Sequence, residues 1–172
     1  MLVIHARWTN HSQRSPHLVT YPGRRADQDK VAHLRHRLFQ AENGVNVYVT
    51  ASEYIGLNQM LDMVRKHSTP ADYLVAYPYH PSINLLTNRR TYERNVYIDN
   101  ATQTPNWNNE AIRRIQRFRP AVIVLSDWDI NGTEASRFSV WAEKTKTWIQ
   151  TNYLHQTDVL EFEIFTRPER EQ

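Results

Sequence analysis

Short apolar runs of strand length alternate with longer segments of helical periodicity, and this alternation limits the fold more than any other feature. The clearest strand is predicted at 121–125 (AVIVL), directly after Pro120. Five apolar residues are too few for a typical helix and suit a strand that is buried on both faces. The preceding segment 108–118 places apolar side chains at helical spacing and arginines on the other face. Strands and helices that alternate in this way predict an α/β fold.

The same two patterns recur along the rest of the chain. Further strands are predicted at 2–8, 46–50, 72–77, 95–99 and 158–167, and further helices at 26–41, 50–66 and 133–150. Thr50 and Glu53 have the spacing of a capping box, which marks the start of the helix at 50–66. The segment 158–167 alternates apolar residues with glutamates, which is typical of a strand with one wet face.

The order of these elements predicts a three-layer α/β domain. We expect a mixed, mainly parallel central sheet, with the C-terminal strand antiparallel or at an edge. A chain of 172 residues is long enough for one ordinary domain. We therefore assign an α/β core domain to 43–168, a less clearly patterned N-terminal portion of the same domain to 1–42, and a tail to 169–172.

The composition excludes several kinds of site. The chain has no cysteine, which rules out disulfides, thiolate metal sites and cysteine nucleophiles. Its longest apolar runs are far shorter than the roughly 20 residues that a membrane-spanning helix needs. The first residues, MLVIHARW, lack the features of a signal peptide. We expect the isolated chain to be soluble, with any export signal outside this sequence.

The richest candidate site is the stretch AYPYHPSINLLTNRRTYERN at 76–95, which follows the strand at 72–77. Ligands of α/β domains tend to bind beyond the carboxyl ends of parallel strands. We predict that polar side chains here bind a ligand, and a pair of guanidinium groups would suit a phosphate or a carboxylate. The candidates are Tyr77, Tyr79, His80, Asn84, Asn88 and Arg89. For the arginines we favour a role in salt bridges or solvation, and we keep Arg89 as a binding candidate.

A second candidate follows the strand at 121–125, where the sequence reads SDWDING. Asp127 and Asp129 would hold a cation or orient a sugar hydroxyl at this point. Carboxylates in a loop that leads into a helix also serve as caps and turn residues. We favour capping for this pair and keep both residues as binding candidates.

No metal, cofactor or catalytic residue is predicted. The eight histidines include His33 and His36 on one predicted helix, but no motif such as HExxH completes a metal site. The sequence has no glycine-rich phosphate loop of either common kind. Ser126 follows a strand but lacks the flanking glycines of a nucleophile elbow.

The charge balance permits an anionic partner without requiring one. There are 21 basic and 18 acidic residues, a formal net charge of +3. Basic side chains gather at 24–37 and at Arg113, Arg114, Arg117 and Arg119. Acidic residues interrupt each basic run, and the aromatic residues fall at core-like spacings. We therefore interpret these arginines as a solvated face and do not expect a nucleic acid partner.

Several segments, read in order, resemble the soluble C-terminal domain of polytopic glycosyltransferases related to the dolichyl-phosphate-mannose protein mannosyltransferases. The resemblance covers about 43–168. It includes the turn at 69–72 (TPAD), the strand ending in an aromatic-proline pair at 74–78 (LVAYP) and PSINLLTNR at 81–89. Further on it includes PAVIVL at 120–125, the pair Asn152-Tyr153 and a final strand that closes at Arg167.

The resemblance implies a multi-pass membrane hexosyltransferase that takes sugar from a polyprenyl-phosphate donor on the extracytoplasmic side of a membrane. The catalytic carboxylate of such enzymes lies between membrane helices, so this domain would not be catalytic alone. Its implied partners are the transmembrane helices of the parent enzyme, the membrane surface, and a lipid-linked donor or an acceptor. Two alternatives remain open from the residues alone: a basic nucleic-acid-binding module and a free-standing α/β domain that binds a small ligand.

Overall fold

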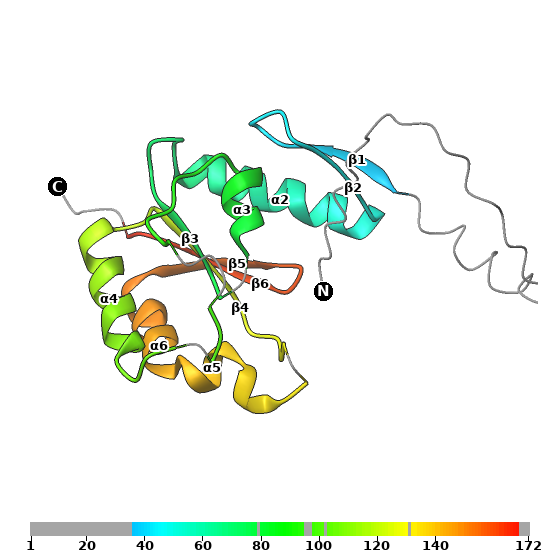
Figure 1. Cartoon of the computed structure of the whole chain (residues 1–172). Coiled ribbons are helices and arrows are strands. Elements are labelled where there is room, and N and C mark those ends of the chain that lie inside the picture. The colour runs from blue at the N-terminus through cyan, green and yellow to red at the C-terminus, as the bar shows by residue number, and fades with distance from the viewer. Residues whose placement is uncertain (1–35, 79, 95–97, 102, 131, 169–172) are drawn as a thin grey trace, which may run out of the picture.

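The structure is a computed structural model that describes residues 36–78, 80–94, 98–101, 103–130 and 132–168 (Figure 1). Its strands are β1 (Arg37–Gln40), β2 (Asn46–Val49), β3 (Leu74–Tyr77), β4 (Val122–Ser126), β5 (Leu154–Val159) and β6 (Phe162–Thr166). Its helices are α2 (Ala51–His67), α3 (Pro81–Leu86), α4 (Trp107–Phe118), α5 (Phe138–Trp141) and α6 (Glu143–Asn152), with a 3-10 turn η1 (Glu134–Ser136). No helix in this described part is both long and apolar enough to cross a bilayer.

The main sheet has four strands in the order β3-β4-β6-β5. β3 and β4 are parallel, whereas β6 is antiparallel to both β4 and β5. The predicted α/β class with a mixed sheet is confirmed, and so is the antiparallel setting of the last strand. The prediction of a mainly parallel sheet is wrong: one strand pair is parallel and two are antiparallel, because β2 does not join this sheet and β5 and β6 form a hairpin. β2 instead pairs with β1 in a separate two-stranded sheet.

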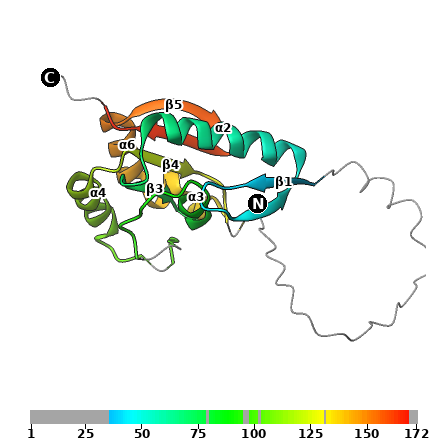
Figure 2. The ribbon, with the colours of Figure 1, turned by 90° about the horizontal axis from the view of Figure 1, so that it is seen from above.

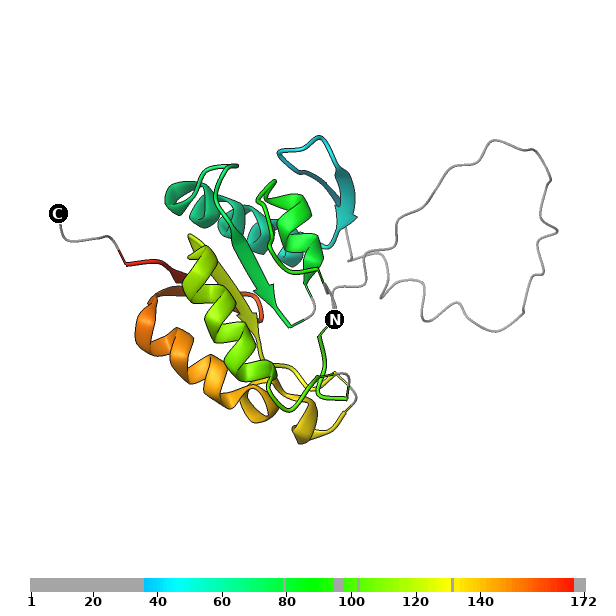
Figure 3. The same cartoon turned by 60° about the vertical axis from the view of Figure 1, so that its left-hand side comes forward.

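Two helix layers enclose the main sheet (Figures 2 and 3). α2 and α3 cover one face, where Met60, Val64 and Ile83 pack in one cluster with side chains of β3, β4 and β6. α4, α5 and α6 cover the other face through a second apolar cluster, which includes Ile115 and Ile149. Every residue of β4 is buried. This burial explains why the apolar run at 121–125 was readable as a central strand.

Helix α2 begins where its capping box predicts. The Glu53 backbone N–H donates to Thr50 Oγ1 at 3.3 Å, and the Thr50 backbone N–H donates to Glu53 Oε2 at 2.8 Å. These two bonds satisfy amide groups that the first helical turn leaves without intrahelical partners. The buried stripe of the helix runs through Leu57, Leu61 and Val64. The helix is thereby fixed against the sheet and against the β1–β2 hairpin.

The predicted helix at 26–41 is wrong over its described part. Residues 37–40 form β1, in which Phe39 is buried while Leu38 and Gln40 face outward. This alternation is the period of a strand, and β2 supplies the hydrogen-bonding partner. The predicted strand at 2–8 and the remainder of that helix lie outside the described residues, as does most of the predicted strand at 95–99.

Two other segments are broken where continuous elements were predicted. The segment 158–167 contains the tight turn of the β5–β6 hairpin, because Leu160 adopts a φ of 55° and reverses the chain. The predicted helix at 133–150 is divided into η1, α5 and α6, with a break at Ala142. The stretch 76–95, predicted as a loop, contains helix α3.

Candidate functional site

The carboxyl ends of the parallel strands β3 and β4 bring together His80 and Ser126. His80 Nε2 lies 2.7 Å from Ser126 Oγ, and Trp128 Nε1 donates to the same oxygen at 3.0 Å. Trp128 Nε1–H also lies 3.4 Å from His80 Nε2, where a second N–H would repel it, so Nε2 is the unprotonated nitrogen and accepts from the Ser126 hydroxyl. The imidazole of His80 therefore carries its proton on Nδ1. This arrangement ties the end of β4 to the segment that follows β3.

The His80–Ser126 pair is enclosed by protein. His80 is 7% exposed and Ser126 is 1% exposed. The His80 and Phe162 rings pack edge to face, with 4.7 Å between their centroids. Burial lowers the pKa of His80 to about 4, so the imidazole is neutral at physiological pH. A substrate has no access to a serine buried in this way, so we assign the pair a role in positioning the two strand ends.

Asn84 and Arg89 use their polar groups inside the protein. Asn84 Nδ2 donates to the carbonyl of Leu74 at 2.8 Å. The Arg89 side chain is 3% exposed and pairs with Glu42 at 2.9 Å. Its Nε also donates to Ser68 Oγ at 2.9 Å. These contacts join α3, α2 and the β1–β2 hairpin, which accounts for both side chains structurally.

Asn88, another residue predicted in this stretch, lies in the turn after α3. Asn88 is exposed and adopts a φ of 51° just after α3. Asparagine tolerates this left-handed conformation better than most residues, so its place in the turn has a local reason. Tyr79 lies outside the described residues.

Asp127 holds the start of α5, in agreement with the capping interpretation. Its Oδ1 accepts from the backbone N–H of Ser139 at 2.6 Å, and its Oδ2 lies 3.6 Å from Lys146 Nζ. Asp129 is exposed, and its nearest cation is Arg137 at 3.7 Å. Among the described residues, no group of three His, Cys, Asp or Glu side chains is placed to hold a metal ion.

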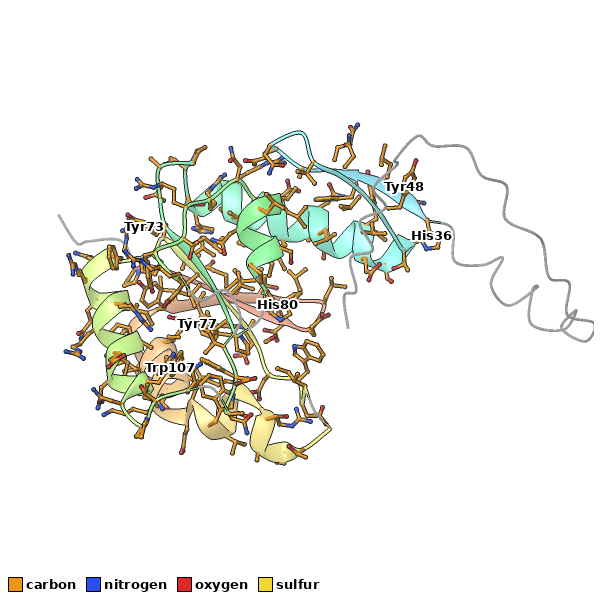
Figure 4. All side chains as sticks on the ribbon, viewed as in Figure 1. His36, Tyr48, Tyr73, Tyr77, His80 and Trp107 are labelled. Atoms are coloured by element: carbon orange, nitrogen blue, oxygen red, sulfur yellow. The ribbon has the colours of Figure 1, made fainter. Side chains whose placement is uncertain are left out.

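Tyr77, labelled near His80 in Figure 4, belongs to a second polar cluster, beside α4. Its hydroxyl donates to Glu93 Oε1 at 2.7 Å. Burial raises the pKa of Tyr77 well above its usual range, so the hydroxyl stays protonated and keeps this bond. The Glu93 carboxylate is 9% exposed, and Arg114 Nε lies 3.4 Å from it. Burying a carboxylate is costly unless it is paired, and here a guanidinium and a hydroxyl donor both face it.

A cavity of about 400 Å³ opens beside this carboxylate. Its lining residues are Tyr92, Glu93, Arg94, Ile98, Gln103, Thr104, Trp107, Glu110 and Arg114. We call it the Glu93 pocket. Its size is within the range of small-molecule sites, and it combines aromatic side chains with a few charged groups, as such sites do.

The walls of the Glu93 pocket are held by aromatic packing. Trp107 packs against Tyr77 at 5.7 Å and against Trp141 at 4.9 Å between ring centroids. Tyr92 stacks on Phe118 at 4.7 Å with an interplanar angle of 13°. Burial also raises the pKa of Tyr92, so its hydroxyl is a neutral group beside the pocket. These ring contacts fix the positions of Trp107 and Tyr92 in the pocket wall.

The sequence pointed to Tyr77 but not to Glu93, its partner. The two residues meet because Arg90 forms a parallel bridge with Tyr73, which makes the following residues run alongside β3. A single bridge has no signature in the sequence. An available signal was the position of Glu93 between Tyr92 and Arg94, in a segment where arginines otherwise dominate.

Three comparisons with known proteins found no match for this chain. No family model matches it, and neither the curated proteins nor the solved structures contain a match.

Proposed function

We propose that this domain binds a sugar in the Glu93 pocket and serves as the non-catalytic, extracytoplasmic accessory domain of a membrane glycosyltransferase that uses a polyprenyl-phosphate sugar. The observation that carries the binding function is the Glu93 carboxylate, held by Tyr77 and Arg114 at the edge of a cavity of about 400 Å³. The placement beside a membrane rests separately on the sequence resemblance over 43–168.

The charges of the Glu93 pocket favour a neutral ligand rich in hydroxyl groups. Two carboxylates, Glu93 and Glu110, face two guanidinium groups, Arg94 and Arg114, so the formal charges of the lining cancel. A hydroxyl group can donate to a carboxylate and accept from a guanidinium at the same time. The half-buried ring of Tyr92 offers an apolar surface of the kind on which a sugar ring packs. An anionic ligand would meet both carboxylates, and a cationic ligand both arginines.

Binding of a panel of neutral monosaccharides is measured by saturation-transfer NMR and by calorimetry. We expect at least one sugar to bind, and Glu93→Gln to weaken its affinity about tenfold or more, because a hydrogen bond to a charged group contributes about 1.5–3 kcal/mol. Glu93→Gln retains an acceptor for Tyr77 and so preserves the fold. Glu161→Gln, at the exposed turn between β5 and β6, is the matched control. Absence of binding to every sugar, or equal affinity of both variants, would overturn the binding function.

The membrane placement is tested independently through the natural gene. We expect several apolar segments of membrane-spanning length in the reading frame upstream of this domain. In that full-length protein, Glu93→Gln is expected to reduce sugar transfer, while Glu161→Gln leaves it unchanged. A complete reading frame without such segments would refute the glycosyltransferase assignment and leave a free-standing sugar-binding domain.

A further inference from the structure

Five arginines gather at the end of the sheet opposite the carboxyl ends of β3 and β4. They are Arg90, Arg113, Arg117, Arg119 and Arg167, and all five are exposed. We call this surface the arginine face. Arg90 pairs with Tyr73 just before β3, Arg119 directly follows α4, and Arg167 directly follows β6. Figure 4 shows Tyr73 and Tyr77 at the two ends of β3. The arginine face adjoins the Glu93 pocket, because Tyr92 in the pocket wall packs against Tyr73 and Phe118.

Ring contacts connect the arginines on the β3 side to those on α4. The Arg90 guanidinium lies 4.9 Å from the centroid of the Tyr73 ring, and the Arg117 guanidinium lies 5.2 Å from that of Phe118. The Tyr73 and Phe118 rings pack edge to face at 5.4 Å. The two guanidinium groups are therefore held over a rigid aromatic base, which lowers the entropy that they lose on binding a partner.

Helix capping explains only part of the arginine face. Arg167 Nη1 donates to the carbonyl of Arg119 at 2.9 Å, next to the end of α4. Cations are favourable at a helix C-terminus because the macrodipole is negative there. Arg113 lies more than one turn before the end of α4, and Arg90 lies on another segment. These two positions gain little from the dipole, which acts within the last turn.

Within the described part of the chain, none of the five arginines forms an ion pair with a carboxylate. The acidic residues that interrupt the basic runs in the sequence lie elsewhere: Glu93 pairs with Arg114, and Glu110 is in the first turn of α4. Hydrogen bonds from the Thr69 backbone and hydroxyl lower the pKa of Asp72, and the charge of Arg167 adds a smaller lowering without an ion pair. The arginine face is thus more strongly positive than the sequence suggested.

We propose that the arginine face docks on an anionic membrane surface. One guanidinium group can bind two oxygens of a phosphodiester at the same time. The surface of an anionic bilayer presents many phosphodiester groups in a flat array. The five arginines project from strand ends and a helix, and none of them lines the Glu93 pocket. A single-stranded nucleic acid is usually bound in a groove, so the exposed, open setting favours the membrane. Leu154 pairs with Thr166, next to Arg167, and is 52% exposed, which adds an apolar side chain beside this surface.

This inference rests on the proposed placement of the domain beside a membrane but not on sugar binding. The two fail separately, since vesicle binding needs no sugar and sugar binding needs no vesicle.

The test is cosedimentation of the full chain with vesicles of phosphatidylcholine alone or with about one third phosphatidylglycerol, at low and at raised salt. We expect binding to the anionic vesicles only, with loss at raised salt. Arg113→Gln/Arg117→Gln should lower the partition coefficient about 25-fold, since each arginine near an anionic surface contributes about fivefold. The control variant Arg37→Gln/Lys144→Gln also removes two positive charges, one from the β1–β2 hairpin and one from α6. It should lower the partition coefficient much less.

Three results would overturn the inference. The first is absence of binding to anionic vesicles at low salt. The second is equal loss of binding in the two double variants, which would indicate an effect of net charge alone. The third is tighter binding of the wild-type chain to single-stranded RNA than to the vesicles, with loss in Arg113→Gln/Arg117→Gln, which would assign the same face to a nucleic acid. Circular dichroism of each variant confirms that the fold is intact.

Discussion

His80 Nε2 and Ser126 Oγ lie 2.7 Å apart and join two residues that are 46 positions apart in the chain. The bond connects the segment after β3 to the last residue of β4, and it requires the imidazole to be neutral. A proton on Nε2 would remove the acceptor that the Ser126 hydroxyl needs. The stability of the fold is therefore expected to depend on the protonation of one buried histidine.

The first prediction is a loss of stability in acid that depends on His80. Its folded-state pKa is lowered from 6.5 to about 4, so the unfolded chain binds a proton at higher pH than the folded chain does. The contribution of His80 is complete above pH 6.5 and falls as the pH drops toward 4, by about 3 kcal/mol in total. Urea unfolding at several pH values should show a shallower decline for His80→Gln than for His36→Gln, an exposed control. Parallel declines in both variants would contradict the prediction.

The second prediction concerns the buried guanidinium of Arg89. Arg89→Lys should lower the free energy of unfolding by about 3 kcal/mol, because an ammonium cannot replace contacts to Glu42, Ser68 and Thr87 together. The affinity for sugars should not change in the folded fraction. Arg113→Lys on the exposed side of α4 is the control for stability. Loss of sugar binding at full stability would return Arg89 to the list of ligand contacts.

The third prediction concerns Tyr77 and the Glu93 pocket. Tyr77→Phe removes a donor to Glu93 without changing the ring that packs between Trp107 and Phe138. We expect a cost of about 1–2 kcal/mol in stability and a weaker affinity for the sugar, since the carboxylate is less firmly held. Calorimetry compares this variant with Tyr48→Phe, a change at a side chain that is 74% exposed. Unchanged affinity in Tyr77→Phe would show that this hydroxyl does not support the pocket.

The fourth prediction follows from the contact between Gly56 and Leu160. A Cβ atom at Gly56 would overlap the Leu160 side chain at the tip of the β5–β6 hairpin. Gly56→Ala should therefore destabilise the protein by about 1–2 kcal/mol, although alanine is the better helix former. Adding Leu160→Ala removes the clash, so Gly56→Ala/Leu160→Ala should be more stable than Leu160→Ala alone. Additive effects in this cycle would show that the two sites are independent.

The fifth prediction separates helix capping from metal binding at Asp127. Asp127→Ala should cost about 1 kcal/mol through loss of the bond to the Ser139 backbone, whereas Asp127→Asn retains an acceptor and should cost less. Thermal unfolding of the wild-type chain should be the same with and without EDTA. A melting temperature that falls on chelation, and no longer does so in Asp127→Asn, would support a cation at this position.

The elements that were predicted correctly are those with a short-range signal in the sequence. The capping box at Thr50 and the apolar run of β4 both gave correct elements, because each is a short-range feature that burial reinforces. The β5–β6 turn was missed because it uses a non-glycine residue, Leu160, at positive φ. β1 was missed because its four residues also fit helical spacing, and only pairing with β2 decides between the two.

Among the described residues that the sequence proposed for binding, only Tyr77 reaches the Glu93 pocket, through its bond to Glu93. Strand order put Tyr77 and His80 near the carboxyl end of β3, as expected from the general position of ligand sites in α/β domains. The partners that determine their roles are distant in sequence: Glu93 for Tyr77 and Ser126 for His80. These partners are set by tertiary pairing. No local pattern in the sequence indicates which residue will become the partner of Tyr77 or of His80.

The position of β6 between β4 and β5 has a consequence for how the protein is made. β4 has β3 as its only neighbour in the sheet until residues 162–166 have left the ribosome, although it is buried on both faces in the finished protein. During the synthesis of about 40 further residues, the apolar strand β4 therefore has one edge without a partner strand. An unpaired apolar strand of this kind promotes aggregation of the growing chain. A stop codon anywhere before β6 would leave that strand with a permanently open edge.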